Sequence, residues 1–165
     1  MSLQRCGSAL SQRGRVSMKN DEQNRLAVGA FSRGGRYPAF AWQFRTNIAN
    51  WNDPPAKFTL DGPFEVGSRG TTQLPGQEPL YWRIREIRPG KSFVLEMQLD
   101  RATLSFEWRF DSLPGNRTRL TQHIVLSGDN AGAYAGQVEA GFGPNLPDGM
   151  RRVAAEMAGT ERHSK

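Results

Sequence analysis

The sequence has few of the residues that bind metals or form disulfides. Its 165 residues include one cysteine, Cys6, and two histidines, His123 and His163. A single cysteine excludes an intramolecular disulfide, and two histidines far apart in the chain do not supply the ligands of a zinc site. The segment GSRGTT at residues 67–72 lacks the lysine of a phosphate-binding loop. We therefore expect no metal and no other cofactor.

The chain also lacks a long apolar segment. No stretch approaches the ~18 to 20 apolar residues that a membrane-spanning helix needs, and no apolar region of a signal peptide follows the basic N-terminus. These absences predict a soluble protein of the cytoplasm without a membrane span. The length suits one domain, because domains usually have about 100 to 200 residues.

The formal net charge of +6 is unevenly distributed. Residues 1–20 carry four basic residues and no acidic one, whereas the rest of the chain carries 18 basic and 16 acidic residues. A nearly balanced domain without a recognisable binding motif argues against nucleic acid as a partner. The polar composition of residues 1–20 predicts a disordered tail, followed by a single folded domain at residues 21–158 and a frayed C-terminus at residues 159–165.

Apolar and polar residues alternate between residues 57 and 128, as expected for antiparallel strands with one apolar face. Residues typical of tight turns separate the alternating segments. The aromatic segment around Trp108 is the clearest case, with Phe106 and Phe110 on the same predicted face. The predicted strands lie at residues 57–60, 67–74, 81–85, 93–99, 104–110 and 117–127.

Two segments have helical spacing instead. Phe40, Phe44 and Ile48 recur every four residues in the segment before Trp51. Near the C-terminus, apolar residues recur at steps of three or four, which predicts one long helical stripe with a kink where prolines interrupt it. That stripe consists of Tyr134, Val138, Phe142, Leu146, Met150, Val153 and Met157.

Several short motifs together resemble the SRPBCC or START-like superfamily, in its polyketide cyclase/dehydrase-like branch. They are PAFAW and IANW at residues 38–51, GPFEVG at 62–67, GNRTRLT at 115–121 and the apolar segment 146–157. The resemblance implies an α+β helix-grip fold, in which a curved antiparallel seven-stranded sheet wraps around a long C-terminal helix. It further implies two short helices after a first strand at residues 26–36.

A sheet that curls around a helix encloses apolar volume, so a cavity for a small hydrophobic or amphipathic molecule, such as a lipid, is the first functional hypothesis. The protein would then be a carrier or a sensor, either a monomer or a homodimer. An aromatic stripe serves equally well as core. The residues predicted to face the ligand are Trp82, Leu95, Met97, Phe106, Trp108, Tyr134, Val138 and Phe142.

Two other functions stay open. One is a polyketide cyclase/dehydrase-like enzyme that acts on an aromatic or polyketide-type substrate, with His123 as a weak candidate for general acid or base. The strand around His123 is apolar on both faces, so either face could point inward. The other is a protein-partner binding module with a collapsed cavity. A dry, aromatic interior favours the carrier or sensor, and we prefer the non-catalytic hypothesis.

Overall fold

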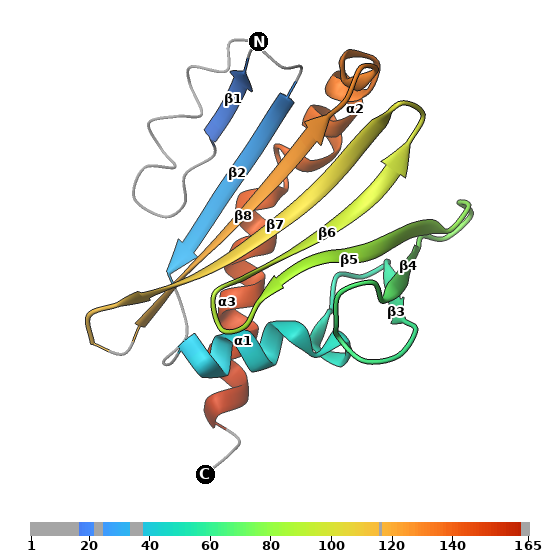
Figure 1. Ribbon diagram of the computed structural model, residues 1–165. Helices are drawn as coiled ribbons and strands as arrows, with labels where there is room; N and C mark the ends of the chain where they lie inside the picture. Colours follow the sequence, from blue (N-terminus) through green and yellow to red (C-terminus); the bar gives the residue numbers. More distant parts are fainter. Residues whose placement is uncertain (1–16, 22–24, 34–37, 116, 163–165) are drawn as a thin grey trace.

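The computed structural model describes residues 17–21, 25–33, 38–115 and 117–162, and it shows a curved antiparallel sheet with helices on one side (Figure 1). The strands are β1 Ser17–Asp21, β2 Arg25–Arg33, β3 Lys57–Leu60, β4 Arg69–Gln73, β5 Leu80–Arg88, β6 Ser92–Leu99, β7 Ala102–Leu113 and β8 Arg117–Ser127. The helices are α1 Pro38–Thr46, the short 3₁₀ helix η2 Ile48–Asn50, α2 Ala131–Phe142 and α3 Leu146–Arg162. This arrangement confirms the predicted α+β helix-grip architecture.

The sheet has eight strands in the order β1-β2-β8-β7-β6-β5-β4-β3. From β3 to β8 each strand pairs with the next strand along the chain. Strand β2 pairs with β8, and β1 lies at the edge beside β2. All six strands predicted from alternation are confirmed. The strand implied at residues 26–36 is present as β2, although Gly34 and Gly35 lie outside the described residues.

The predicted count of seven strands is one too low. The additional strand, β1, pairs antiparallel with β2, with Ser17 opposite Gly29. Strand β1 includes residues 17–20, which were predicted to belong to the disordered tail. Residues 1–16 lie outside the described residues. A short, mostly polar segment gives no alternating apolar pattern from which a strand could be predicted.

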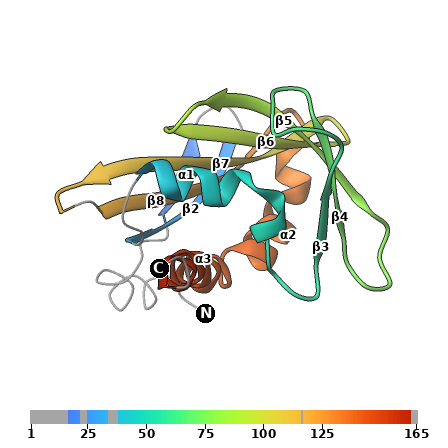
Figure 2. The ribbon, with the colours of Figure 1, turned by 90° about the horizontal axis from the view of Figure 1, so that it is seen from below.

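The helices cover one face of the sheet (Figure 2). Trp42 of α1 packs edge-on against Phe110 of β7, with ring centroids 5.4 Å apart. Phe142 of α2 packs edge-on against Phe106, also of β7, at 5.5 Å. Phe106 and Phe110 are four residues apart in one strand and therefore share a face. We call this face the helix-facing side of the sheet.

The predicted C-terminal stripe is divided between two helices. Helix α2 ends at Phe142 and α3 begins at Leu146, so the expected kink is a complete break. Pro144 has no N–H group with which to continue the hydrogen-bond ladder of α2. The last helix, α3, buries Leu146, Met150 and Met157 against the core, as a helix gripped by the sheet must do.

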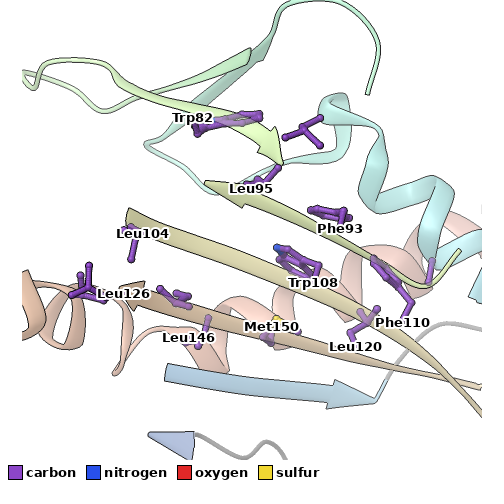
Figure 3. Packing of buried hydrophobic residues seen from close by; sticks show 14 of the residues in the cluster. Trp82, Phe93, Leu95, Leu104, Trp108, Phe110, Leu120, Leu126, Leu146 and Met150 are labelled. Atoms are coloured by element: carbon purple, nitrogen blue, oxygen red, sulfur yellow. The ribbon is translucent and has the colours of Figure 1, made fainter. Parts of the chain in front are cut away.

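The hydrophobic core lies between the helix-facing side of the sheet and the helices (Figure 3). Its largest fully buried side chains, Trp108 and Phe93, are stacked with ring centroids 6.1 Å apart. Full burial of a large apolar side chain stabilises the folded state by about 1.5 to 3 kcal/mol. The core is therefore centred on β6 and β7, the middle of the sheet.

Candidate functional site

Phe106 keeps contact with solvent at the centre of the sheet. It lies in β7 on the helix-facing side, opposite Leu95 of β6 and Ile124 of β8. Residues directly opposite one another in antiparallel strands share a face. Leu95 and Ile124 are buried, whereas Phe106 is only half-buried. Part of the Phe106 ring is therefore accessible to solvent on the helix-facing side of a central strand.

Three other half-buried side chains pack around the same region. Met97 lies on the same face as Phe106 and diagonally across from it, since Met97 is opposite Leu104. Phe142 touches Phe106 from α2, and Tyr134 lies on the same side of α2 as Phe142, two turns earlier. All are half-buried and pack against the core. We call Met97, Phe106, Tyr134 and Phe142 the apolar strip.

The other residues predicted to face a ligand lie in the packed core. Trp82 stacks on Trp51, with ring centroids 5.5 Å and ring planes 26° apart, and its Nε1 donates to the hydroxyl of Thr72 at 3.1 Å. Its ring also covers Gly70, where an added Cβ would lie 2.2 Å from the ring. Exposure of these residues is 6% or less. The buried set consists of Trp82, Leu95, Trp108 and Val138.

Of the neighbouring residues Trp82 and Tyr81, only Trp82 points inward, because successive residues of a strand face opposite sides of the sheet. Trp82 is 6% exposed and Tyr81 is 70% exposed. Trp42 holds α1 against Phe93 and Phe110 of the sheet. Trp42 and Trp82 therefore belong to the packed core and not to the partly accessible apolar strip.

A charged side chain enters the core beside these aromatic residues. The guanidinium carbon of Arg45 lies 4.2 Å from the ring centroid of Trp108 and 4.5 Å from that of Trp51. Trp51 stacks on Trp82, and Trp108 stacks on Phe93. The guanidinium thus links two aromatic pairs that come from different elements. We call Arg45, Trp51 and Trp108 the arginine cluster.

The end of α1 and the 3₁₀ turn that follows bring Trp51 back to Arg45. Asn47 accepts a hydrogen bond from the backbone N–H of Ala49 at 3.1 Å, and the amide of Asn50 donates to the carbonyl of Phe44 at 3.0 Å. The indole Nε1 of Trp51 then donates to the carbonyl of Arg45 at 2.7 Å. These local bonds, together with the packing of Trp51 against Trp82 of β5 and Phe58 of β3, hold the Trp51 ring over the guanidinium.

The guanidinium of Arg45 is incompletely satisfied. Its Nε is inaccessible to solvent and has no hydrogen-bond acceptor, although the residue as a whole is half-buried. Burial lowers the pKa of Arg45 to about 10, while the carboxylates of Glu156 and Asp53 act in the opposite direction. Arg45 therefore stays protonated at neutral pH. Asp53 also accepts a hydrogen bond from Arg152 of α3 at 2.7 Å, so it is shared between two cations.

His123 lies on the other side of the sheet. It is opposite Glu107, on the face that alternates with the one carrying Trp108. The structure thus does not bring His123 together with the apolar strip or the arginine cluster. Glu96 is the buried acid of that outer face, and it accepts a hydrogen bond from Arg83 at 2.6 Å. Within the described ranges, no group of three or more His, Cys, Asp or Glu side chains could hold a metal ion.

Arg45 is the member of the site that the sequence did not point to. The helical stripe of Phe40, Phe44 and Ile48 drew attention to the apolar residues of this segment. Arg45 follows the fully buried Ala41 by one helical turn. A cation on the buried side of an amphipathic helix was the available signal, because such a position usually carries an apolar residue.

No protein-family model matches this sequence, and no curated protein matches it in sequence. No helix in the described part of the chain is long and apolar enough to cross a membrane. Solved structures, in contrast, resemble the fold over most of its length. Protein Ms6760 from Mycobacterium smegmatis is 18% identical with a TM-score of 0.61, and the match covers 88% of this chain and 99% of that one.

Two similar structures are enzymes. Norcoclaurine synthase from Thalictrum flavum, a point mutant in complex with a transition-state analogue, is 10% identical with a TM-score of 0.65. That match covers 89% of this chain and 99% of the synthase. The Zhui aromatase/cyclase from Streptomyces sp. R1128 is 18% identical with a TM-score of 0.61, over 81% of this chain and 94% of the cyclase. Identities this low show the shared architecture alone: the chain has the same helix-grip fold, a curved antiparallel sheet with a long last helix.

Proposed function

We propose that this protein binds a small hydrophobic or amphipathic molecule between the helix-facing side of its sheet and α2 and α3, as a carrier or a sensor. The observation that carries this proposal is the exposure of Phe106 in a central strand, next to the buried Leu95 and Ile124. An apolar ligand that covers Phe106 removes apolar surface from water, which favours binding roughly in proportion to the area covered.

The chemistry of the apolar strip indicates the kind of ligand. Phe106, Tyr134 and Phe142 offer aromatic faces and edges, and Met97 offers a flexible side chain that adapts to different shapes. Norcoclaurine synthase from Thalictrum flavum, which shares the fold, has been solved in complex with dopamine and hydroxybenzaldehyde. A flat, aromatic or similarly rigid molecule suits the strip of this chain as well.

A catalytic version of this proposal has less support. The cyclase/dehydrase-like alternative relied on His123 as acid or base, and His123 lies on the face of the sheet away from the strip. Binding without turnover is the function that the described side chains support best.

A neutral fluorescent probe tests the proposal directly. N-phenylnaphthylamine is apolar and aromatic, and its emission rises when it leaves water. We expect it to bind the wild-type protein, and we expect Met97→Glu to weaken binding about tenfold or more, because the new carboxylate would have to lose water beneath the probe. Gln98→Glu is the matched control, since Gln98 is the next residue of β6 and is exposed on the other face.

The two variants place the same residue on the two sides of one strand. Equal binding by Met97→Glu and Gln98→Glu, with both proteins folded by circular dichroism, would contradict a site on the helix-facing side. Mass spectrometry of molecules that copurify with the wild type provides the second test. A molecule that is retained by Gln98→Glu and lost from Met97→Glu identifies the natural ligand class.

A further inference from the structure

We propose that Arg45 anchors an acidic group of the ligand, so that the ligand class is an amphipathic organic acid: a rigid apolar body with one carboxylate or comparable oxyanion. This inference rests on the proposed function, because it concerns the same space between sheet and helices. The observation behind it is a charged guanidinium in the arginine cluster whose Nε has no acceptor.

A donor in this condition is unusual. Buried polar groups nearly always have a hydrogen-bond partner, and a buried donor without one destabilises the fold. The two tryptophan rings attract the cation through their faces, but a ring face does not accept the in-plane N–H bonds of a guanidinium. An oxyanion that approaches the guanidinium edge would supply the missing acceptor, and paired N–H groups of arginine suit a carboxylate especially well.

The charged groups around Arg45 do not provide the acceptor that its Nε lacks. The charges that act on Arg45 are those of Glu156, from α3, and Asp53, from the loop after η2, and Asp53 is paired with Arg152 of α3. Neither carboxylate accepts a hydrogen bond from Nε. Asp53 is already bonded to Arg152, and its side chain is 60% exposed, so water and salt screen its attraction for Arg45.

The anchor and the apolar strip lie at a suitable separation. Trp108, which contacts the guanidinium, and Phe106, which belongs to the strip, are two residues apart on one face of β7. Same-face neighbours along a strand are about 7 Å apart. A ligand of one or two fused rings is long enough to cover Phe106 and extend along the strand to Trp108, where a shift of the side chains that enclose Nε would bring its acidic group to Arg45.

A pair of probes with the same aromatic skeleton separates the anchor from the strip. Anilinonaphthalene sulfonate is N-phenylnaphthylamine with one added sulfonate. We expect the wild type to bind the sulfonate probe about tenfold or more tightly than the neutral one, a ratio typical of a charge-assisted hydrogen bond. Arg45→Met should remove this preference while binding of the neutral probe persists, because methionine keeps much of the aliphatic volume.

Two further variants complete the test. Arg45→Lys keeps a positive charge without the paired N–H groups, so it should retain part of the preference. Arg109→Met is the matched control: Arg109 is the next residue after Trp108 in β7, lies on the other face, and has a side chain that is 60% exposed. This control should leave both affinities unchanged. Near-ultraviolet circular dichroism and melting curves establish that each variant is folded.

The possible outcomes distinguish the two proposals. If wild type binds neither probe, the proposed function is wrong and the inference falls with it. If the neutral probe binds well but the sulfonate adds nothing, or if Arg45→Met keeps the preference, the binding function stands and the anchor is refuted. If Arg45→Met does not fold, the anchor is tested by the wild type and Arg45→Lys. The anchor is refuted if the wild type binds both probes equally, or if Arg45→Lys prefers the sulfonate probe as strongly as the wild type does.

Discussion

The guanidinium of Arg45 lies 4.2 Å from the ring centroid of Trp108, so a cation from the first helix meets the aromatic centre of the sheet. Trp108 is only 2% exposed. Placing a charge beside so buried a ring opposes folding through lost hydration, and the ring face only partly offsets that loss. An arrangement that does not favour stability is a natural place to look for function.

Arg45→Met should change the free energy of unfolding by no more than about 1 kcal/mol, because losing the ring contacts is offset by relief of the unpaired Nε. Trp108→Ala is the contrasting variant, with an expected loss of about 3 to 5 kcal/mol from the cavity it leaves. Chemical denaturation measures both. A loss in Arg45→Met as large as that in Trp108→Ala would assign Arg45 a structural role.

Asp53→Asn should strengthen binding of anilinonaphthalene sulfonate by about threefold, because it removes a carboxylate that competes for Arg45 and exposed charge interactions amount to about 1 kcal/mol or less. The gain should shrink at high salt, where the interaction is screened. Fluorescence titrations at low and high ionic strength measure it. Weaker binding in Asp53→Asn would show that the ion pair with Arg152 shapes the site instead.

Binding of the sulfonate probe should be constant from about pH 6 to pH 9, since the sulfonate stays ionised and the pKa of Arg45 is lowered only to about 10. As the pH rises through that value, the guanidinium loses its proton and the affinity should fall. Titrations across this range check both statements. A change in affinity between pH 6 and pH 9 would contradict the anchor.

His123→Gln should leave the affinity for the neutral probe and the melting temperature nearly unchanged, because His123 is on the outer face, opposite Glu107. The same variant also examines the catalytic alternative. Once a copurifying ligand is known, incubation with wild type and His123→Gln shows whether either converts it. Turnover by the wild type that disappears in the variant would overturn our preference for a non-catalytic binder.

Gly70→Ala should destabilise the protein by about 1 to 3 kcal/mol through overpacking, because an added Cβ would lie 2.2 Å from the ring of Trp82. Gly136→Ala is its control: Gly136 is exposed within α2 and nothing lies near its Cβ position. That change should stabilise the helix by about 0.5 to 1 kcal/mol. Thermal melts decide, and equal melting temperatures for the two variants would refute the close packing of Trp82 on Gly70.

The strands from β3 to β8 were predictable because alternation is a local property. Trp82 and Tyr81 are adjacent in β5, so alternation places them on opposite faces, and their exposures of 6% and 70% agree. The face of His123 was not predictable in this way. Its strand is apolar on both sides, so only the register with β7 shows that it is opposite Glu107 and away from the helices.

For the predicted ligand-facing residues, the sequence predicted the face of the sheet but not the exposure to solvent. Alternation placed Leu95 and Phe106 correctly on the apolar face of their strands, but it could not separate a packed residue from an accessible one. Leu95 is buried and Phe106 is not. That difference depends on which parts of the sheet the helices cover, and it is settled by packing between elements distant in the chain.

By itself the sequence determined the antiparallel meander, the helical C-terminus with its proline interruption and the balance between apolar and charged faces, since each depends on residues close together in the chain. Only the tertiary structure decided which aromatic residues stay accessible, which face carries His123 and where Arg45 lies. The contact between Arg45 and Trp108 joins α1 to β7. The burial of Arg45, its lowered pKa and its unpaired Nε arise from that packing, and no periodicity in the sequence encodes them.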